Sequence, residues 1–297
     1  MITMAPAYDP NRYQAEIAEA RAVTGTPDTA RQALEALDLT TLKDNDKRQG
    51  IETAAEMAAF LEVAKEPVDG SKIAAVCVYP NKIRTAKKAL AGTGIGIATV
   101  VNFPLADDKV QKIKRDTAMA VKAGADEIDV VIPFKPTGQF RDHLQRMLPV
   151  KAVREAAPDA VIKVILETNQ LQDPKEVYEA SLDAIRGGAN MLKTSTGKND
   201  GDVTLEHAAA MLAAICDSGE DVGLKISKGV KTNDQAAQYM ALADKIMGDG
   251  FSANPEKFRF GASSLHAALA AEIRPAGATA KAGPDAGAKP GFPGSDY

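Results

Sequence analysis

Two lysines each close a short apolar run in the second half of the chain. Lys193 ends the run Asn190–Lys193, and Lys225 ends the run Val222–Lys225. An ammonium group is costly to remove from water, so lysine is rare inside apolar segments. If the two runs are neighbouring strands, each ammonium group disfavours the charge of the other. A lysine whose pKa is lowered in this way is a nucleophile near neutral pH and can form an imine with a carbonyl compound.

The size of the required pKa shift decides whether such a nucleophile can exist. Lowering the pKa of a lysine from ~10.4 to ~7 takes roughly 4.6 kcal/mol, which burial and one close like charge can supply together. The alternative is that Lys193 and Lys225 pair with carboxylates and have only a structural role. Clusters of ionisable groups with shifted pKa values are usually functional, so the sequence favours a nucleophile.

A carboxylate suited to pair with these lysines lies in the segment Glu127–Ile132. Glu127 and Asp129 point to the same face of an extended strand, so alternation alone does not choose between them. Asp129 lies deeper in the segment, between two apolar residues. Asp129 is therefore the expected partner of a buried lysine.

Eight apolar runs alternate with segments of helical period, and each run is predicted to be a strand. The runs are Leu34–Leu39, Ile73–Val78, Ile95–Val101, Glu127–Ile132, Val161–Leu166, Asn190–Lys193, Val222–Lys225 and Phe258–Phe260. Between the strands, apolar residues recur at helical spacing, for example over residues 51–58. Eight β-then-α units over about 240 residues predict a single (β/α)8 (TIM) barrel of the α/β class. The active site is then expected at the carboxyl ends of the strands.

The chain is predicted to have three parts. Residues 1–30 form an N-terminal extension with a helix over Asn11–Val23, and residues 31–273 form the barrel. Residues 274–297 contain 6 Ala, 5 Gly and 4 Pro and have no apolar period. This composition predicts a flexible C-terminal tail.

Composition disfavours several other classes of protein. The formal net charge of −4, without a basic patch, disfavours nucleic-acid binding. No apolar run approaches the roughly 18 residues of a membrane span, so no membrane association is expected. Two cysteines, in a chain without a visible export signal, favour the cytoplasm. The three histidines, His143, His207 and His266, have no metal-ligand spacing, so neither a metal nor another cofactor is expected.

Six short motifs resemble the deoxyribose-phosphate aldolase family in their order and spacing. They are Asp38-Leu39-Thr40-Thr41-Leu42, Cys77-Val78-Tyr79-Pro80, Val101-Asn102-Phe103-Pro104, Gly124-Ala125-Asp126-Glu127-Ile128-Asp129-Val130-Val131, Lys193-Thr194-Ser195-Thr196-Gly197-Lys198 and Arg259-Phe260-Gly261-Ala262-Ser263-Ser264. The lysine hexapeptide together with the acidic octapeptide is the most specific part of the resemblance. The family consists of metal-independent class I aldolases on a (β/α)8 barrel, which agrees with the fold expected from the strands.

The resemblance implies an enzyme that reversibly cleaves 2-deoxy-D-ribose 5-phosphate to acetaldehyde and D-glyceraldehyde 3-phosphate. By motif position, Lys193 is expected to be the Schiff-base nucleophile and Lys225 the neighbour that lowers its pKa. Asp129 is expected to take part in proton transfer through a water molecule, assisted by Lys225. Tyr297 matches relatives whose last tyrosine reaches back into the active site. The implied partners are small phosphosugars and aldehydes, and the family suggests a homodimer.

The same motifs imply a set of substrate-binding residues. Asp38 and Thr196 are expected to contact substrate hydroxyls, and Lys198 is expected to lie at the phosphate end. The other candidates are Thr40, Cys77, Gly197, Lys228, Gly229, Gly261, Ser263 and Ser264. The loops after the seventh and eighth strands are expected to form the phosphate pocket, with backbone N–H groups as donors.

One position departs from the family pattern. Lys228 stands where the family has the first of two glycines after the seventh strand, and a left-handed backbone there costs a lysine on the order of 1 kcal/mol. Its side chain either adds a cation to the phosphate site, obstructs it or points to solvent. Two other functions stay open: a Schiff-base aldolase or transaldolase-like enzyme for a different phosphosugar, and a catalytically silent barrel that only binds phosphosugars. The presence of both Lys193 and Lys225 argues against the silent barrel.

Overall fold

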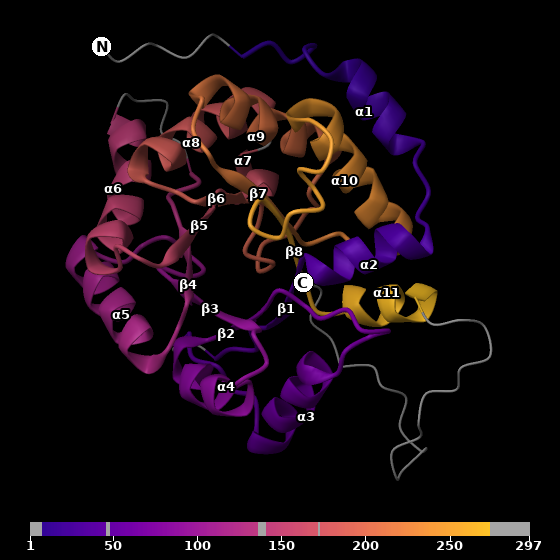
Figure 1. Cartoon of the computed structure of the whole chain (residues 1–297). Helices are drawn as coiled ribbons and strands as arrows, with labels where there is room; N and C mark the ends of the chain where they lie inside the picture. Colours follow the sequence, from indigo (N-terminus) through magenta and orange to yellow (C-terminus); the bar gives the residue numbers. More distant parts are fainter. Residues whose placement is uncertain (1–7, 46–47, 136–140, 172, 274–297) are drawn as a thin grey trace.

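The eight apolar runs form eight strands that close a parallel barrel (Figure 1). The structure is a computed structural model, which describes residues 8–45, 48–135, 141–171 and 173–273. The strands are β1 Leu37–Thr41, β2 Ala75–Val78, β3 Gly96–Val101, β4 Glu127–Val131, β5 Val161–Ile165, β6 Met191–Lys193, β7 Gly223–Ser227 and β8 Phe258–Ala262. Each strand pairs with the next in parallel, and β8 pairs with β1. The predicted (β/α)8 barrel is confirmed.

Helices follow every strand and surround the barrel (Figure 1). They are α1 Gln14–Arg21, α2 Pro27–Glu35, α3 Ala54–Lys65, α4 Ile83–Ala89, α5 Val110–Ala123, α6 Arg141–Ala156, α7 Thr168–Leu171, α8 Pro174–Gly187, α9 Leu205–Ser218, α10 Asn233–Met247 and α11 Leu265–Ile273, with a 3-10 turn η1 at Pro80–Lys82. The helix expected over Asn11–Val23 is observed as the shorter α1. Within the described ranges, no helix has the length and apolar character that crossing a membrane requires.

The first strand begins later than predicted, because capping residues start a helix that includes part of the predicted run. The prediction of a strand from Leu34 is wrong, because Leu34 lies in α2 and β1 begins at Leu37. Thr26 accepts a hydrogen bond from Thr29 N at 3.2 Å, and Pro27 occupies the first helical position. These signals start a helix that extends into the apolar run, and Leu34 is fully buried on its inner face.

A capping box also fixes the start of α3. Helical period over residues 51–58 predicts a helix that includes Ile51, whereas α3 begins at Ala54. Thr53 Oγ1 accepts from Glu56 N, and the Glu56 side chain accepts from Thr53 N at 2.8 Å. This reciprocal pair satisfies two backbone donors at the helix end and leaves Ile51 outside, where it is 51 % exposed.

Strand register turns one face of each strand toward the barrel axis. Lys193 pairs with Lys225 on β6 and β7, and Asp129 pairs with Lys163 on β4 and β5. Asp38 Oδ2 of β1 lies 3.2 Å from Lys163 Nζ of β5, although these strands are not neighbours in the sheet. Such a contact is possible only across the inside of the barrel. The face with the charged residues is therefore the interior face.

The apolar core lies between the strands and the surrounding helices. Ile162, Val164, Leu192 and Leu224 alternate with the interior lysines and are fully buried on the opposite face. Burying one side chain of this size stabilises the fold by about 1.5–3 kcal/mol. Because the outer layer supplies this stabilisation, the barrel interior can hold charged groups instead of an apolar core.

Candidate active site

Three buried lysines meet at one carboxylate inside the barrel. Asp129 Oδ2 accepts hydrogen bonds from Lys193 Nζ at 2.8 Å and from Lys225 Nζ at 3.0 Å. Its other oxygen, Oδ1, accepts from Lys163 Nζ at 3.0 Å. None of the four side chains is more than 4 % exposed. The structure thus brings together Asp129, Lys193 and Lys225, for which the sequence predicts catalysis.

Lys163 was missed by the sequence-based prediction of the site. Besides Asp129, it hydrogen-bonds Glu127, and it lies 3.2 Å from Asp38 Oδ2. A signal for it exists in the sequence, because Lys163 stands in the middle of the apolar run Val161–Leu166. The ammonium group of a lysine at such a position is as costly to remove from water as those of Lys193 and Lys225.

Arg259 is a second missed member of the cluster. Its Nη1 donates to Asp38 Oδ1 at 2.6 Å, and its Nη2 donates to Glu127 Oε1 at 3.3 Å. Arg259 is the second residue of β8 and lies between two phenylalanines of the predicted strand Phe258–Phe260. A charged residue between two apolar ones in a strand was therefore a signal, but the sequence did not show which carboxylates its guanidinium group would meet.

The neighbours of each lysine shift its pKa in a different direction. Burial lowers the pKa of Lys193, and the Lys225 ammonium group adds to this, so that together they outweigh Asp129. Lys225 is also buried, but Asp129 and Asp38 outweigh its burial and raise its pKa. The pKa of Lys163 is raised well above its usual value, because three carboxylates outweigh its burial. The Lys225 charge thus disfavours the charge of Lys193, while the carboxylates near Lys225 raise the pKa of Lys225 itself.

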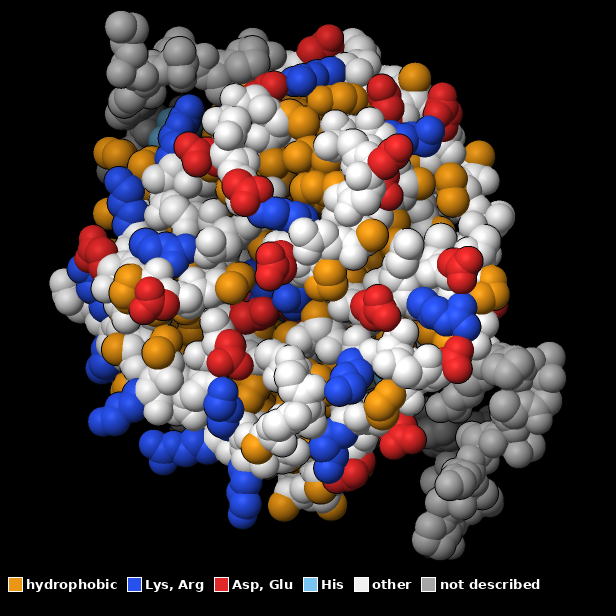
Figure 2. Space-filling model, in the orientation of Figure 1, with side chains coloured by type: hydrophobic (Ala, Val, Ile, Leu, Met, Phe, Trp, Pro, Cys, Tyr) orange, Lys and Arg blue, Asp and Glu red, His pale blue; other side chains and the backbone are white. Residues whose placement is uncertain are grey.

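The balance of charges in the cluster agrees with a neutral Lys193. The cationic groups are Lys163, Lys193, Lys225 and Arg259, and the carboxylates are Asp38, Glu127 and Asp129. If Lys193 is neutral, three cations face three carboxylates, and an unbalanced buried charge is avoided. On the face seen along the barrel axis, acidic and basic side chains lie next to one another at the centre (Figure 2). A neutral Lys193 amine has the lone pair that nucleophilic attack requires.

The candidate residues of β1 and β2 are buried beside this cluster. Asp38 Oδ2 accepts from Lys225 Nζ at 2.5 Å. Although burial raises the pKa of Asp38, Lys163 and Lys225 outweigh it and hold the pKa far below the usual range. Thr40 Oγ1 donates to the Asp38 carbonyl at 2.9 Å. Burial raises the pKa of the Cys77 thiol to about 11, so this thiol is neutral near pH 7.

A buried glutamate holds the loop that follows β6. Glu167 is fully buried two residues after the end of β5, with a φ of 57°, and its carboxylate accepts from Thr196 N at 3.2 and 3.3 Å. Burial raises the pKa of Glu167. The Thr196 hydroxyl in turn accepts from Lys198 N at 3.0 Å. Glu167 was not selected from the sequence, although it directly follows the predicted strand Val161–Leu166.

Lys198 joins the loop after β6 to the loop after β1. Gly197, with a φ of 79°, makes the left-handed turn that precedes it. Lys198 Nζ donates to Leu42 O at 2.6 Å and to Asp44 Oδ1 at 3.0 Å. The ammonium group therefore lies over the mouth between the two loops, where its contact with a phosphate stays a prediction.

Lys228 has the left-handed backbone that its position in the sequence predicts. Its φ is 72°, and that of Gly229 is 83°. The half-buried Lys228 side chain donates a hydrogen bond to Asn199 O in the loop after β6. The side chain bonds the protein instead of pointing to solvent, and this hydrogen bond connects the loops after β6 and β7.

The end of β8 supplies the remaining candidates. Gly261 is buried on the interior face, and a Cβ atom there would lie 2.8 Å from Lys225 Cε, so glycine makes room for the lysine. Ser263 is half-buried and Ser264 is exposed, directly before α11. The free backbone N–H groups at the start of a helix are suited to bind an anion.

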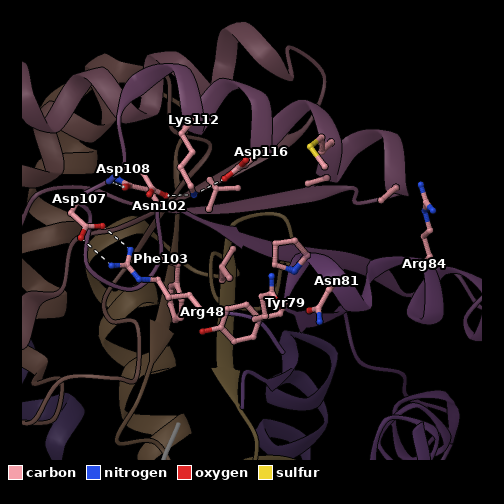
Figure 3. Close-up of a pocket in the computed structure, with 17 residues that line it drawn as sticks. Arg48, Tyr79, Asn81, Arg84, Asn102, Phe103, Asp107, Asp108, Lys112 and Asp116 are labelled. Carbon is pink, nitrogen blue, oxygen red and sulfur yellow. Dashed lines mark hydrogen bonds and ion pairs between the residues drawn. The ribbon is translucent and has the colours of Figure 1, made fainter. Parts of the chain in front are cut away.

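A separate groove of about 860 Å³ is lined mainly by the loops after β2 and β3 and by residues of α5 (Figure 3). Its charged side chains are largely neutralised by one another. Arg48 Nη1 donates to Asp107 Oδ1 at 2.7 Å, and Lys112 Nζ donates to Asp116 Oδ2 at 2.7 Å. The charged cluster of the barrel interior does not line this groove. The candidate active site is therefore the barrel mouth.

Two sequence-based expectations are not decided by this geometry. Tyr297 and the whole predicted tail 274–297 lie outside the described residues. In the part of the chain that the structure describes, no group of three or more His, Cys, Asp or Glu side chains could hold a metal ion. Metal-independent chemistry stays a prediction.

The barrel is similar to several solved structures. A protein from Coccidioides immitis, provisionally assigned as a deoxyribose-phosphate aldolase, is 24 % identical with a TM-score of 0.69, over 89 % of this chain and 97 % of that chain. A Toxoplasma gondii ME49 protein with the same provisional assignment is 24 % identical with a TM-score of 0.74, over 83 % and 97 % of the two chains. The deoxyribose phosphate aldolase from Aeropyrum pernix, described as a tetramer, is 21 % identical with a TM-score of 0.63, over 86 % and 95 %. These likenesses show the fold. The family model of the DeoC/LacD aldolases matches residues 32–271, and the chain belongs to this family of aldolases.

Proposed function

We propose that this chain is a class I aldolase that reversibly cleaves 2-deoxy-D-ribose 5-phosphate to acetaldehyde and D-glyceraldehyde 3-phosphate. Membership of the aldolase family supports lyase chemistry, and the six motifs support this substrate. The observation that carries the proposal is the buried cluster in which Lys193 Nζ and Lys225 Nζ donate to the same Asp129 oxygen, where burial lowers the pKa of Lys193.

The first step forms the covalent bond between enzyme and substrate. The neutral Lys193 amine attacks the aldehyde carbon of the open-chain sugar and forms a carbinolamine, which loses water to give an imine. Asp129 Oδ2 lies 2.8 Å from Lys193 Nζ and 3.0 Å from Lys225 Nζ. A proton lost by the Lys193 nitrogen can therefore pass to Asp129, and Lys225 can supply the proton that leaves with the water molecule.

The second step breaks the carbon–carbon bond. The substrate's C3 hydroxyl loses its proton to a water molecule held by Asp129, and the C2–C3 bond breaks. Its electron pair moves into the protonated imine, which becomes an enamine, and glyceraldehyde 3-phosphate leaves. Protonation of the enamine carbon and hydrolysis of the imine then release acetaldehyde and the free Lys193 amine.

We assign the proton transfer at the enamine carbon to Tyr297, by its resemblance to the last tyrosine of family members. Removal of Tyr297 alone is expected to slow deuterium exchange into acetaldehyde and to leave imine formation intact. An unchanged exchange rate would show that the phenol has no part in the reaction.

The substrate's phosphate is expected at the loops after β7 and β8. Lys228 and Gly229 lie in the first loop, and Ser263 and Ser264 lie in the second, next to the N-terminus of α11. Backbone N–H groups of these loops would donate to the phosphate oxygens, and the Lys198 ammonium group would add a positive charge nearby. Asp38 and Thr196 remain the candidates for contacts with substrate hydroxyls.

One observation favours a second candidate, a Schiff-base aldolase for a different sugar. Lys228 stands where the family has a glycine, in the loop proposed to bind the phosphate, and its side chain donates a hydrogen bond to Asn199 O. Comparison of kcat/KM on 2-deoxyribose 5-phosphate and on other phosphosugar aldehydes separates the two substrates. A silent barrel has less support, because both Lys193 and Lys225 are present and clusters of buried ionisable groups with shifted pKa values are usually functional.

The setting of the reaction is also part of the proposal. We expect a cytoplasmic enzyme of deoxyribonucleotide and carbohydrate catabolism that works as a homodimer. Light scattering on the purified chain gives its mass in solution, and a monomer or a tetramer would contradict the dimer.

The experiment that tests the proposed function is chemical trapping of the imine. The enzyme is incubated with acetaldehyde and borohydride, digested, and mapped by mass spectrometry. The expected product is a two-carbon adduct on the peptide that contains Lys193. An adduct found only on Lys225 or Lys198 would reverse the assignment of the nucleophile, and the absence of any adduct would contradict the Schiff-base reaction.

A further inference from the structure

Ser227, the last residue of β7, has a buried hydroxyl without a hydrogen-bond partner among the described residues. The side chain is 2 % exposed. Both backbone polar groups of Ser227 have hydrogen-bond partners. Its N–H donates to Thr194 Oγ1 at 2.8 Å, and its carbonyl accepts from the same hydroxyl at 2.9 Å. Buried hydroxyls in proteins nearly always have a partner, so this one calls for a physical explanation.

The hydroxyl lies on the interior face of the barrel. Ser227 pairs with Gly261 of β8, and a Cβ atom on Gly261 would overlap Ser227 Oγ and lie 2.8 Å from Lys225 Cε. Ser227 and Lys225 therefore project to the same side of β7. Since Lys225 reaches Asp38 and Asp129 inside the barrel, the Ser227 hydroxyl is directed into the same space.

The position of Ser227 along β7 places it between the two ends of the proposed substrate. Lys225, two residues earlier, is paired in register with Lys193, where the imine would form. Lys228, the next residue, begins the loop at which the phosphate is expected. A sugar chain attached to Lys193 that extends toward this loop must pass Ser227, and its middle carbons carry hydroxyl groups.

We propose that Ser227 Oγ hydrogen-bonds a hydroxyl group on the substrate's carbon chain, between the imine carbon and the phosphate, and thereby selects hydroxylated aldehydes. This inference rests on the proposed aldolase function. The hydroxyl without a partner in the free protein gains one when the substrate is bound. A serine is suited to this contact, because it can both donate and accept and carries no charge.

The test uses the synthesis direction, in which acetaldehyde is added to an acceptor aldehyde. Ser227→Ala and Ser227→Cys are compared with the wild type on glyceraldehyde 3-phosphate, glyceraldehyde and propanal. Cysteine fills the space of serine but is a weak hydrogen-bond donor, so it separates packing from hydrogen bonding. The ratio of kcat/KM for glyceraldehyde over propanal is expected to fall about tenfold in both variants, since one hydrogen bond is lost.

A matched control removes an equally buried hydroxyl elsewhere. Thr117 on α5 is fully buried, and its Oγ1 has no partner among the described residues. Thr117→Val is expected to leave the glyceraldehyde to propanal ratio within twofold. The thermal midpoint of the substrate-free Ser227→Ala protein is expected to be unchanged or higher, because no protein hydrogen bond is removed.

Three results would overturn the inference. An unchanged ratio would show that Ser227 does not sense the hydroxyl group, and that its partner is water. A loss on glyceraldehyde 3-phosphate alone would assign Ser227 to the phosphate. A lowered thermal midpoint with equal losses on all acceptors would show a structural role. Failure of the proposed function is a separate result, because wild-type enzyme would then give no acetaldehyde adduct on Lys193 at all.

Discussion

Lys193 and Lys225 occupy paired positions on adjacent strands and donate to the same oxygen of Asp129, yet their pKa values are shifted in opposite directions. The difference comes from Asp38, which lies 2.5 Å from Lys225 Nζ. These shifts favour the charged form of Lys225, and the Lys225 charge in turn disfavours the charge of Lys193. The directions agree with the proposed roles of Lys193 as the nucleophile and of Lys225 as the cation that lowers its pKa.

Replacement of Lys193, the proposed nucleophile, is the most direct genetic test. Lys193→Arg keeps a positive charge and most of the side-chain volume, but it cannot form an imine. Turnover is expected to fall by more than about 10³-fold. Circular dichroism and thermal unfolding are expected to show an intact barrel. Residual activity within tenfold of the wild type would exclude Lys193 as the nucleophile.

The charge of Lys225 should set the pH dependence of imine formation. If Lys193 is the nucleophile, only its neutral form attacks the aldehyde, and the trapping rate is expected to rise with pH through the pKa of Lys193. Lys225→Met removes the like charge but leaves Asp129 in place, so the pKa of Lys193 is expected to rise. The rising limb of the trapping rate then moves to higher pH. The readout is the borohydride trapping rate as a function of pH.

The matched control for this experiment is Lys225→Arg, which keeps a positive charge. Its rising limb is expected near that of the wild type, even if proton transfer and turnover are slower. If the trapping rate of Lys225→Met rises at the same pH as that of the wild type, the Lys225 charge does not control the pKa of Lys193.

Loss of Lys163 is expected to destabilise the whole barrel. Lys163→Met leaves three buried carboxylates with one cation fewer, and breaking a buried ion pair typically costs about 3–5 kcal/mol. The free energy of unfolding from denaturant titration measures this loss. Lys65→Met is the control, because its ion pair with Glu62 is at the surface and contributes about 0–1 kcal/mol. Similar values for the two variants would show that the buried cluster adds no stability.

Activity is expected to survive exhaustive treatment with EDTA. In the proposed mechanism, the imine supplies the electron sink that a bound metal would otherwise provide, and the lysines and carboxylates of the barrel supply the proton transfers. Turnover of 2-deoxyribose 5-phosphate is measured before and after chelation. Loss of activity with recovery on addition of zinc would place the enzyme among the metal-dependent aldolases.

Lys228, in the loop proposed to bind the phosphate, should affect binding more than chemistry. Lys228→Gly removes a side chain with a φ of 72° and its bond to Asn199 O. We expect kcat to change by only a few-fold, about the effect of 1 kcal/mol, and KM to change mainly for the phosphorylated substrate. The comparison is between 2-deoxyribose 5-phosphate and 2-deoxyribose. Equal effects on both sugars would show that Lys228 does not sense the phosphate.

Much of the fold was readable from local sequence patterns. Eight apolar runs and the helical segments between them predicted the barrel, because the burial of parallel strands on both faces leaves a continuous apolar signature. The lysines that close the sixth and seventh runs stood out for the same reason. The errors at Leu34 and Ile51 arose where capping residues moved a helix boundary, and apolar period alone does not report such boundaries.

The cluster around Asp129 was decided by the tertiary structure. Arg259 and Asp38 are 221 positions apart in the chain, and their contact exists only because β8 closes onto β1. The opposite pKa shifts of Lys193 and Lys225 depend on which carboxylates lie across the barrel from each nitrogen. Sequence determined which residues lie at the ends of the strands, since periodicity is local. Closure and register of the barrel determined which charges meet, since electrostatic interactions depend on distance in space.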